Sequence, residues 1–397
     1  MRVAVVVHRY GVEVLGGAET LARRVAELIA PEVDLTVLTT CALDYRTWTD
    51  HYPPGEASVN GVRVLRYSTP EPRRDRDFQR ASAKAYRAPD DLELGRAWMR
   101  AQGPHTPGLV EHLRDEGSGY DAVAFVTYLY ATTSDGLPLV AERSVLCPTM
   151  HDEPPLRLAI FDGIFERTRL CLFSTPEERE LARRRFGIPD ERARIVGAGI
   201  DEHPEADPER FRHETGIERP YALYLGRLDP SKGVDSLLHH HARYRAARPH
   251  GLDLVLVGSG EIKLPKADGF HAIGFVPERL KHDAIAGATV VVCPSAYESL
   301  SFAQLEAWSH GRPTLSSAAS PVLVGQSRRA GGGLWYSDEA EYVAMLDFLA
   351  RTQPLATAVG NQGRRYVRTE YSWEHVREAW LTALEEVAAA ARTRPLG

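Results

Sequence analysis

The chain has 397 residues, of which 43% are hydrophobic and 26% are charged, and its formal net charge is -6. This length favours two domains, because a single core rarely grows beyond about 250–300 residues. The negative net charge argues against a general binder of nucleic acids or anionic membranes, since both require clustered positive charge.

The cysteine spacing and the N-terminal sequence indicate in which cellular compartment the protein is expected. Cys41, Cys147, Cys171 and Cys293 lie far apart and form no Cys-x-x-Cys pair, so we expect buried, reduced thiols and no zinc site. The apolar run at the N-terminus is too short for a signal peptide, and no stretch approaches the roughly 20 apolar residues of a membrane span. We therefore expect a cytoplasmic protein that contacts a membrane peripherally at most.

Short apolar runs alternate with amphipathic stretches along the chain. The predicted strands are Val3–Val7, Leu35–Thr39, Val62–Tyr67, Ala122–Thr127, Ser144–Pro148, Leu170–Ser174, Ile195–Gly197, Tyr221–Leu225, Leu252–Val257, Ala272–Phe275, Thr289–Cys293 and Pro313–Ser316. Several runs are apolar throughout, which is typical of parallel sheets covered on both faces. The predicted helices include Ala18–Ile29, Glu177–Phe186, Val234–Ala247, Phe302–His310 and Ala340–Leu349. This alternation predicts doubly wound α/β architecture.

The strand–helix series runs twice. Residues 1–200 and 221–372 are expected to form two Rossmann-like domains, joined over 201–220 by a linker rich in proline and charge. The segment 373–397 begins with an amphipathic helix that is expected to cap one domain or to cross back to the first. Residues 71–100 are charged and irregular, and they predict an exposed excursion of the first domain.

Polar residues that follow a strand are the first candidates for a site, because open α/β sheets bind ligands at the carboxyl ends of their strands. Gly226-Arg-Leu-Asp-Pro-Ser-Lys-Gly233 follows one predicted strand. Its glycines permit close approach of a ligand, and Arg227 and Lys232 suit a diphosphate. It is not a Walker loop, because the lysine precedes its glycine. The alternative is a solvated turn with two surface cations.

A second candidate is the segment Cys293-Pro-Ser-Ala-Tyr-Glu-Ser-Leu-Ser-Phe-Ala-Gln-Leu-Glu306, where a buried strand is followed by a helix. Ser301 with Gln304 fits a capping box, and a helix N-terminus binds phosphate. Glu298 in the preceding turn is placed to accept sugar hydroxyls, and Glu306 inside the helix is placed to hold a ribose diol. The alternative is two solvated acids. It fits Glu306 poorly, because this residue lies between apolar neighbours.

Glu298 and Glu306, separated by seven residues after a strand ending Cys-Pro-Ser, resemble the signature of retaining glycosyltransferases of the GT-B fold. The loop at 226–233 resembles the same group, the large group 1 or GT4-like family. The resemblance extends over most of the chain and is strongest over Tyr221–Ser317. It implies two Rossmann-like domains facing across a cleft and a retaining hexosyltransferase. It also implies a nucleoside diphosphate-sugar donor (UDP-, GDP-, ADP- or TDP-linked).

The resemblance also implies a role for each matching residue. Arg227 and Lys232 would bind the donor diphosphate and stabilise charge as it leaves. Glu306 would hold the ribose hydroxyls, Glu298 would face the donor sugar, and the loop at 274–277 would contact the base through its backbone. The remaining residues expected around the donor in this domain are Val276, Ser299, Leu300 and Ser301.

In the first domain, Gly16 and Gly17 open a helix after the first strand, and the resemblance implies that their loop reaches the donor phosphates; an ordinary tight turn is the alternative. His151 follows another strand, where a histidine of similar enzymes hydrogen-bonds the donor sugar. The alternative is a histidine that satisfies a neighbouring loop. The acceptor is expected to be a glycan, glycolipid or natural product. It would contact the aromatic and polar loops at 9–15, 40–52 and 128–134.

Several features are set aside. The run His239-His-His241 lies on a predicted helix, so its three residues do not form one ligand set. Asp75-Arg-Asp77 lies in a charged run, and without a carboxylate cluster at a strand end we expect no essential metal and no cofactor. Arg73, Arg74, Arg76 and Arg80 offer a basic patch for a lipid-linked acceptor or, alternatively, a solvated loop. Many relatives carry Gly-Gly-x-x-Glu where this chain has Ala318–Gly325, which leaves the sugar contacts open.

The resemblance implies front-face displacement, in which the diphosphate leaves, an oxocarbenium-like ion forms and the leaving oxygen deprotonates the acceptor. Two alternatives belong to other classes. A nucleotide-sugar epimerase would use paired acids and bases without an acceptor, and a non-catalytic partner subunit would have lost Arg227, Lys232 or the glutamates. The base, sugar, acceptor and oligomeric state stay open.

Overall fold

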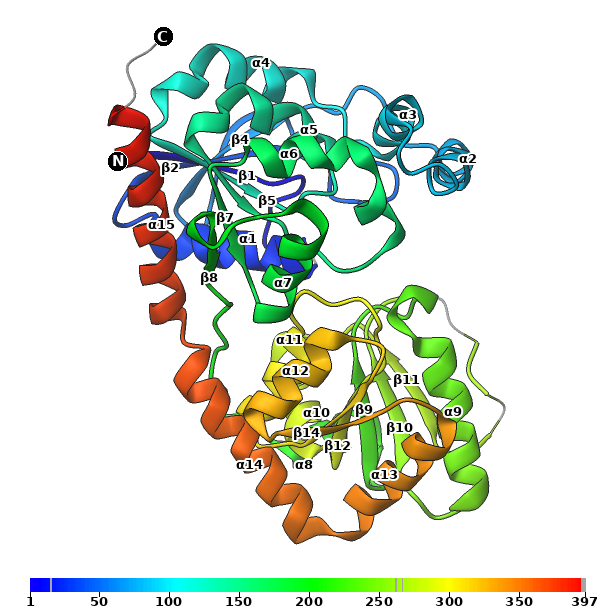
Figure 1. Ribbon diagram of the computed structural model, residues 1–397. Helices are drawn as coiled ribbons and strands as arrows, with labels where there is room; N and C mark the ends of the chain where they lie inside the picture. Colours follow the sequence, from blue (N-terminus) through cyan, green and yellow to red (C-terminus); the bar gives the residue numbers. More distant parts are fainter. Residues whose placement is uncertain (15, 261–262, 266, 394–397) are drawn as a thin grey trace. The chain divides into compact units, whose positions relative to one another are not determined.

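The computed structural model describes residues 1–14, 16–260, 263–265 and 267–393, which form two compact units (Figure 1). Unit 1 contains Met1–Ala198 together with the C-terminal segment from Trp373, and unit 2 contains Gly199–Ser372. Leu15, which falls in one loop expected to contact the acceptor, and the last four residues of the segment 373–397 lie outside the described residues.

The described part of unit 1 contains a sheet of eight strands. They are β1 (Arg2–Val6), β2 (Asp34–Thr40), β3 (Gly55–Val59), β4 (Val62–Tyr67), β5 (Ala122–Val126), β6 (Ser144–Cys147), β7 (Leu170–Phe173) and β8 (Ala193–Ile195). Their order is β3-β4-β2-β1-β5-β6-β7-β8, and all pairs are parallel except β3 with β4. Val3 of β1 pairs with Leu35 of β2 and with Ala122 of β5. The direction of winding therefore reverses beside β1, which is where such sheets bind ligands.

Helices cover both faces of this sheet (Figure 1). They are α1 (Gly17–Ile29), α2 (Asp75–Ala85), α3 (Leu92–Gln102), α4 (Pro107–Glu116), α5 (Ala131–Gly136), α6 (Asp162–Arg167), α7 (Pro176–Phe186) and α15 (Trp373–Thr393). Short 3-10 segments are η1 (Gly117–Gly119), η2 (Leu137–Arg143), η3 (Pro154–Arg157), η4 (Ala159–Phe161) and η5 (Asp190–Arg192). The terminal helix α15 packs against α1, β5 and β6 and so belongs to unit 1.

The segment 71–100 differs from the irregular excursion that its charge predicts, because it contains α2 and α3. Asp91 caps α3 by accepting hydrogen bonds from the backbone N–H of Glu93 and Leu94, at 2.9 and 3.0 Å. Trp98 of α3 is fully buried and packs near Phe78 of α2. The charged residues thus form the outer face of two amphipathic helices.

The described part of unit 2 contains a sheet of six strands, all paired in parallel. They are β9 (Tyr221–Leu225), β10 (Asp253–Val257), β11 (Phe270–Gly274), β12 (Val290–Cys293), β13 (Thr314–Ser317) and β14 (Gly333–Tyr336). The order β11-β10-β9-β12-β13-β14 reverses its winding between β9 and β12. The loops that follow these two strands carry the two sequence motifs of the predicted donor site.

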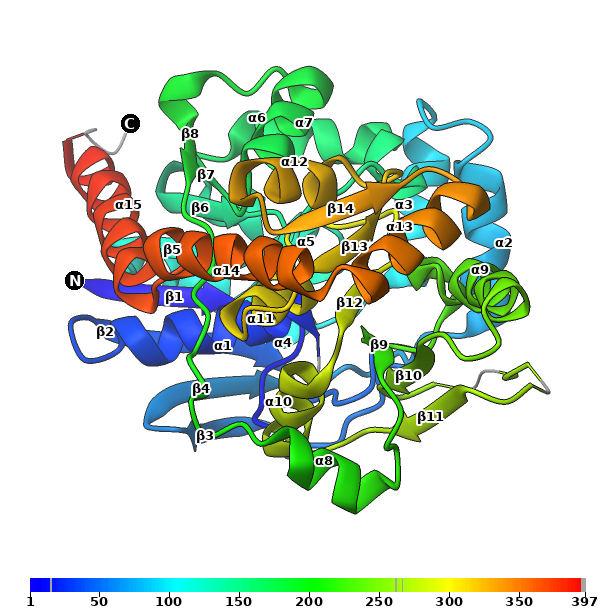
Figure 2. The same ribbon diagram turned by 90° about the horizontal axis from the view of Figure 1, so that it is seen from below.

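Helices cover both faces of the unit 2 sheet (Figures 1 and 2), and a hydrophobic cluster lies on each face. Its helices are α8 (Pro208–Thr215), α9 (Val234–Ala247), α10 (Glu278–Gly287), α11 (Phe302–Ser309), α12 (Pro321–Ala330), α13 (Glu339–Arg351) and α14 (Gln353–Glu370), with the 3-10 segment η6 (Pro230–Lys232). Leu254 and Leu256 of β10 join the cluster under α9 and α13, whereas Val255 and Val257 join the cluster under α8, α10, α11 and α12. This alternation explains why the strand is apolar throughout.

Residues 201–220, expected to be a linker, are part of unit 2 and contain α8. Asp207 caps this helix through the backbone N–H of Glu209 at 3.0 Å, and Phe211 is fully buried. Arg210 forms an ion pair with the buried Asp283 of α10. A buried aromatic residue and an ion pair with a buried carboxylate therefore hold this charged segment against the rest of unit 2.

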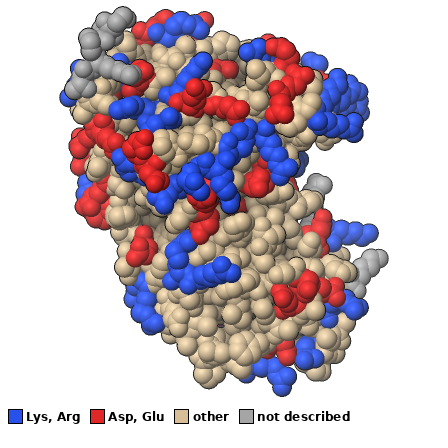
Figure 3. All heavy atoms as spheres, in the orientation of Figure 1, with Lys and Arg blue, Asp and Glu red and all other residues tan. Residues whose placement is uncertain are grey.

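Charged side chains of both signs are interspersed on the face drawn in Figure 3, with a gathering of Lys and Arg over α2. Arg74, Arg76 and Arg80 are exposed there, whereas Arg73 is half-buried and donates to Gln102 at 2.9 Å. The four cysteines are free and buried. In the part of the chain that the structure describes, no helix has the length and apolar character needed to cross a membrane.

Candidate donor-binding site

The loops that follow β9, β10 and β11 lie side by side at the carboxyl edge of the unit 2 sheet. Backbone hydrogen bonds continue past the strand ends, from Gly226 N to Val257 O at 3.0 Å and from Leu228 N to Ser259 O at 2.9 Å. Gly258 N donates to Gly274 O at 2.9 Å. This edge is therefore built of fixed backbone, as a site that must hold a ligand in one pose requires.

Two glycines are required by this backbone packing. Gly258 has φ +146°, and a Cβ atom there would collide with the carbonyl oxygen of Gly226. Gly233 has φ +75°, and a Cβ atom there would lie 2.5 Å from the carbonyl oxygen of Pro294. The second contact joins the loop after β9 to the loop after β12, so the two sequence motifs meet at one place.

Lys232 and Glu298 form the central ion pair of this edge. The Nζ atom of Lys232 donates to Glu298 Oε1 at 2.8 Å, and the two side chains are 29% and 15% exposed. Arg227 lies on the same loop and is exposed; its carbonyl oxygen accepts a hydrogen bond from the Tyr224 hydroxyl at 2.7 Å. The structure thus brings a cation and a carboxylate 66 residues apart into direct contact.

Helix α11 begins directly after these residues. Ser301 caps it, and its hydroxyl accepts from the Gln304 backbone N–H at 3.3 Å. The reciprocal half of the predicted capping box is not formed, because the Gln304 side chain is buried and bonded to Ser316, Leu323 and Ser327. Gln304 therefore anchors α11 to β13 and α12, while its first turn presents backbone N–H groups near Glu298.

Glu306 lies one turn inside α11 and contacts α10. Its Oε1 accepts from the Lys281 ammonium at 2.8 Å, and the same ammonium lies 2.7 Å from Glu278 Oε2. Burial alone would lower the pKa of Lys281, but the two carboxylates outweigh burial and raise the pKa above its usual value. Lys281 is therefore a fixed cation beside the carboxylate that the sequence assigns to ribose.

The loop at 274–277, predicted to contact the base, joins β11 to α10. Val276 is 7% exposed and packs into the core, whereas the neighbouring Phe275 is 63% exposed. Pro277 precedes α10, and its carbonyl oxygen accepts from Lys281 N at 3.0 Å. The base loop and Lys281 thus belong to one short segment.

In unit 1, the Gly16-Gly17 segment opens α1 over a buried charge cluster. Glu19 is 7% exposed, and its Oε1 contacts Nε2 of His8 at 2.9 Å and also the Arg9 guanidinium. Burial opposes ionisation of Glu19, but His8 and Arg9 overcome it and hold its pKa at about 2. A Cβ atom on Gly16 would collide with the Glu19 carboxylate, so the loop packs its backbone directly on this anion.

His151 lies in the loop after β6 and is half-buried. Its Nδ1 lies 3.4 Å from Glu153 Oε1, which also accepts from the Tyr128 hydroxyl at 3.3 Å. Thr127, beside Tyr128, has φ +68°, which is costly for a β-branched residue. Strained backbone of this kind gathers at ligand sites, and it occurs here at the carboxyl end of β5.

The loop that carries His151 is fixed by a buried carboxyl of α7. Glu178 is 1% exposed and accepts from the backbone N–H of Met150 at 2.7 Å and of Ser174 at 2.6 Å. Burial raises the pKa of Glu178 to about 8, although its backbone hydrogen bonds oppose that rise. Thr149, next to Met150, has φ +48°. Glu178 thus ties together the ends of β6 and β7.

Within the described residues, two groups offer three possible metal ligands each. One group contains His239, His240 and Glu339, of which His239 and Glu339 form an ion pair at 2.8 Å; His241 is buried instead against Tyr342. The other group contains Glu278, His282 and Glu306. There the Lys281 ammonium already contacts both carboxylates.

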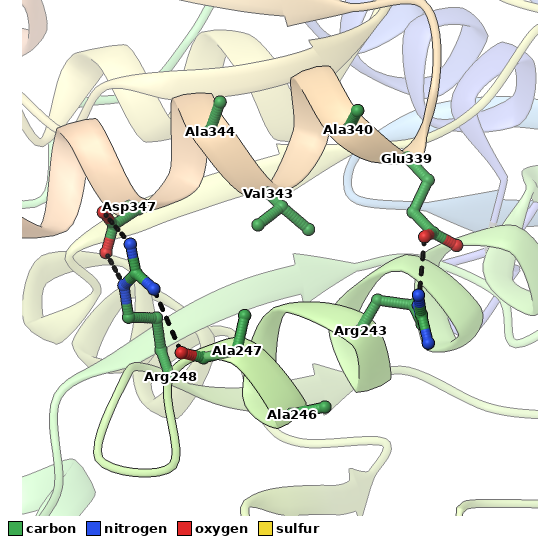
Figure 4. Close-up of a pocket in the computed structure, with 9 residues that line it drawn as sticks. All are labelled: Arg243, Ala246, Ala247, Arg248, Glu339, Ala340, Val343, Ala344 and Asp347. Carbon is green, nitrogen blue, oxygen red and sulfur yellow. Dashed lines mark hydrogen bonds and ion pairs between the residues drawn. The ribbon is translucent and has the colours of Figure 1, made fainter.

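A hollow of about 520 Å³ lies between α9 and α13 (Figure 4). Alanines of both helices and Val343 line it, and the ion pairs Arg243–Glu339 and Arg248–Asp347 lie at its two ends. It contains none of the predicted site residues.

Where many relatives carry Gly-Gly-x-x-Glu, this chain starts α12 with Ser320 as its cap. The Ser320 hydroxyl accepts a hydrogen bond from Leu323 N at 3.4 Å.

Three residues of these sites escaped sequence reasoning. Lys281 pairs with Glu306 across two helices, and no spacing in the sequence links the two. Glu178 carried a usable signal, because Thr175 and Glu178 have capping-box spacing before a helix, and Thr175 does cap Glu178 N at 3.2 Å. Glu19 also had a recognisable sequence signal, because it is an acidic residue three positions after Gly16.

The comparisons with known proteins agree with these observations. Residues 219–350 match the family model for glycosyl transferases group 1. The MMP alpha-(1->4)-mannosyltransferase of Mycolicibacterium hassiacum is 28% identical over 214 residues, which are 51% of this chain and 51% of that protein. The D-inositol 3-phosphate glycosyltransferase of Frankia alni is 28% identical over 280 residues, which are 64% of this chain and 69% of that one. The chain thus matches about half of the first relative's length.

Solved structures extend the likeness of fold to nearly the whole chain. Sucrose-phosphate synthase from Thermosynechococcus elongatus aligns with a TM-score of 0.73 and 18% identity, over 98% of this chain and 99% of that one. Anabaena HepE in complex with UDP-glucose aligns with a TM-score of 0.70 and 14% identity, over 97% of this chain and 100% of that one. The predicted family is confirmed over residues 219–350, which match glycosyl transferases group 1, and the predicted pair of Rossmann-like domains is confirmed by the GT-B fold that the whole chain shares with these solved structures.

Proposed function

We propose that this protein transfers a sugar from a nucleoside diphosphate donor to an acceptor hydroxyl, with retention at the anomeric carbon and without a metal. The observation that carries the proposal is the contact of Lys232 with Glu298 at 2.8 Å, in front of the α11 N-terminus. A cation for the leaving diphosphate and a carboxylate for the sugar are thereby held at one carboxyl edge. Glu306, one turn further on, is available for the ribose.

The charges suit departure of a diphosphate. Arg227, Lys232 and the N–H groups at the start of α11 would stabilise the negative charge that develops as the sugar–phosphate bond breaks. The leaving oxygen would then deprotonate the acceptor hydroxyl on the same face of the sugar. Retaining glycosidases instead use two carboxylates about 5 Å apart. Here Glu298 is neutralised by Lys232 and Glu306 by Lys281, which favours an electrostatic role over a nucleophilic one.

For the acceptor we propose the carboxyl edge of unit 1. The ring of the half-buried Tyr130 lies 4.0 Å from that of the buried His8 and 5.3 Å from that of the buried Trp48, measured between ring centroids. The two buried rings hold Tyr130 in place, and aromatic faces such as that of Tyr130 pack on sugar rings. We assign His151 to the donor sugar, with Glu153 as the residue that orients its imidazole. The Gly16-Gly17 loop is assigned to the donor phosphates.

Thermal unfolding with UDP, GDP, ADP and TDP, each in EDTA, tests the donor site. A ligand at 100 times its dissociation constant stabilises the folded state by about 2.7 kcal/mol, so one nucleotide should raise the melting temperature by several degrees. The shift should be lost in Arg227→Ala. Absence of any shift, in wild type and variant alike, would contradict a donor site. A shift that appears only when Mg²⁺ replaces EDTA would contradict metal independence.

A further inference from the structure

Lys281 contacts two carboxylates at once. Its Nζ atom lies 2.8 Å from Glu306 Oε1 and 2.7 Å from Glu278 Oε2. The Lys281 and Glu306 side chains are 20% and 17% exposed, so both are largely withdrawn from water while retaining one open side. A lysine ammonium has three N–H donors. The two carboxylates use two of them, and the third is available to a ligand.

The Glu306 carboxylate can likewise accept further hydrogen bonds. Among the residues that the structure describes, Lys281 is the donor to its carboxylate, through Oε1, and an ionised carboxylate accepts about four hydrogen bonds. Glu306 can therefore accept from a ligand hydroxyl while it stays bonded to Lys281. A hydrogen-bond donor, Lys281, and a hydrogen-bond acceptor, Glu306, therefore lie side by side at one half-buried position.

The two side chains lie beside the expected path of the nucleotide. Lys281 is in the first turn of α10, directly after the base loop at 274–277, and Glu306 is one turn inside α11. The ribose of a nucleotide joins the base to the diphosphate. It would therefore lie between the base loop and the α11 N-terminus, where these two side chains are found.

We propose that Lys281 and Glu306 together read the ribose diol, and that Lys281 makes the donor site selective for ribonucleoside over 2′-deoxyribonucleoside diphosphates. The inference rests on the proposed donor site and narrows it: UDP-, GDP- or ADP-sugars are accepted, and thymidine-type donors are disfavoured. A hydroxyl both donates and accepts, so each ribose hydroxyl satisfies one group of the pair. A 2′-deoxy sugar leaves half-buried charged groups without their partner, which is costly.

The competing account is that Lys281 only neutralises Glu278 and Glu306 for the sake of folding. In that case its loss would weaken the binding of all nucleotides to the same extent, or only lower the stability. The ratio of affinities for a ribonucleotide and its 2′-deoxy counterpart separates the two accounts, because the two ligands differ by one oxygen atom.

The test measures dissociation constants by isothermal titration calorimetry for matched pairs: UDP and 2′-deoxy-UDP, GDP and 2′-deoxy-GDP, ADP and 2′-deoxy-ADP. Wild type should bind the ribonucleotide of its preferred base at least about tenfold more tightly than the deoxy form. In Lys281→Met this ratio should fall below about threefold. Arg279→Met is the matched control, because it removes a positive charge from the same helix at an exposed pair with Glu214. It should keep the wild-type ratio.

Two results would overturn the inference: a wild-type ratio below about threefold, or a ratio in Lys281→Met equal to that of wild type. The wild-type ratio needs no variant, so the inference stays testable if Lys281→Met does not fold. If none of the nucleotides binds to folded wild-type protein, the proposed function itself fails. That outcome is distinct from binding without ribose selectivity.

Discussion

Replacement of Glu19 by glutamine is a direct test of the buried cluster in unit 1. The carboxylate of Glu19 is 7% exposed and contacts His8, Arg9 and the backbone of Gly16. Glutamine keeps the shape of the side chain but removes its charge. Arg9, which is 6% exposed, would then lose its carboxylate partner.

The size of the effect follows from the buried ion pair, and the lowered pKa of Glu19, about 2 instead of 4.5, gives the same sign. Removal of one partner from a buried ion pair costs about 3–5 kcal/mol. For a unit of this size, about 3 kcal/mol lowers the melting temperature by about 6–12 °C.

The pH dependence has a definite sign. The folded pKa of Glu19 lies below its unfolded value, so its stabilisation is fully present above about pH 4.5 and is lost as the pH falls toward 2. The difference in melting temperature between wild type and Glu19→Gln should therefore shrink as the pH falls through this window. Differential scanning calorimetry at several pH values measures it.

Glu56→Gln is the matched control. Glu56 pairs with Arg63 in the same unit, but it is 61% exposed, so its replacement should change stability by less than about 1 kcal/mol. The reasoning is refuted if Glu19→Gln melts within 2 °C of wild type at pH 7, where about 6 °C or more is expected. It is equally refuted if the difference does not depend on pH.

Two further predictions concern unit 2. Lys232→Met should lower the rate of nucleoside diphosphate release from the donor sugar about 10²–10³-fold, because a preorganised charge is lost; exposed Lys84→Met should leave that rate within about twofold, and equal rates in the two variants would reject the role of Lys232. Gly233→Ala should destabilise unit 2 more than Gly216→Ala, because both residues have φ near +70° but only Gly233 lies against the Pro294 carbonyl. Chemical denaturation measures the difference, and equal losses of about 1 kcal/mol would show that the backbone conformation alone matters.

Much of the fold followed from local patterns. Apolar runs such as Leu252–Val257 predicted β10 to within one residue, and Val62–Tyr67 matches β4, because strands covered on both faces must be apolar throughout. β3 escaped prediction, since Gly55–Val59 is an exposed edge strand with little apolar character. α2 and α3 were missed because their charged outer faces hide a few buried residues such as Trp98.

Some residues of the candidate site could be predicted from the sequence, and others could not. Glu298, Glu306, Arg227 and Lys232 were found from the sequence, because their spacing after strands places them at the carboxyl edge, and their individual roles remain proposals. Lys281 was not found, because its contact with Glu306 depends on how α10 and α11 pack.

The sequence by itself determined most of the buried strands, the helices between them and the polar residues that follow the strands, since all of these depend on patterns a few residues long. The tertiary structure alone decided which charges neutralise one another. Lys232 with Glu298, Lys281 with Glu306 and Glu19 with Arg9 are ion pairs set by the packing of separate segments. Partner choice in a half-buried site depends on distances of a few ångströms, and local sequence carries no information on those distances.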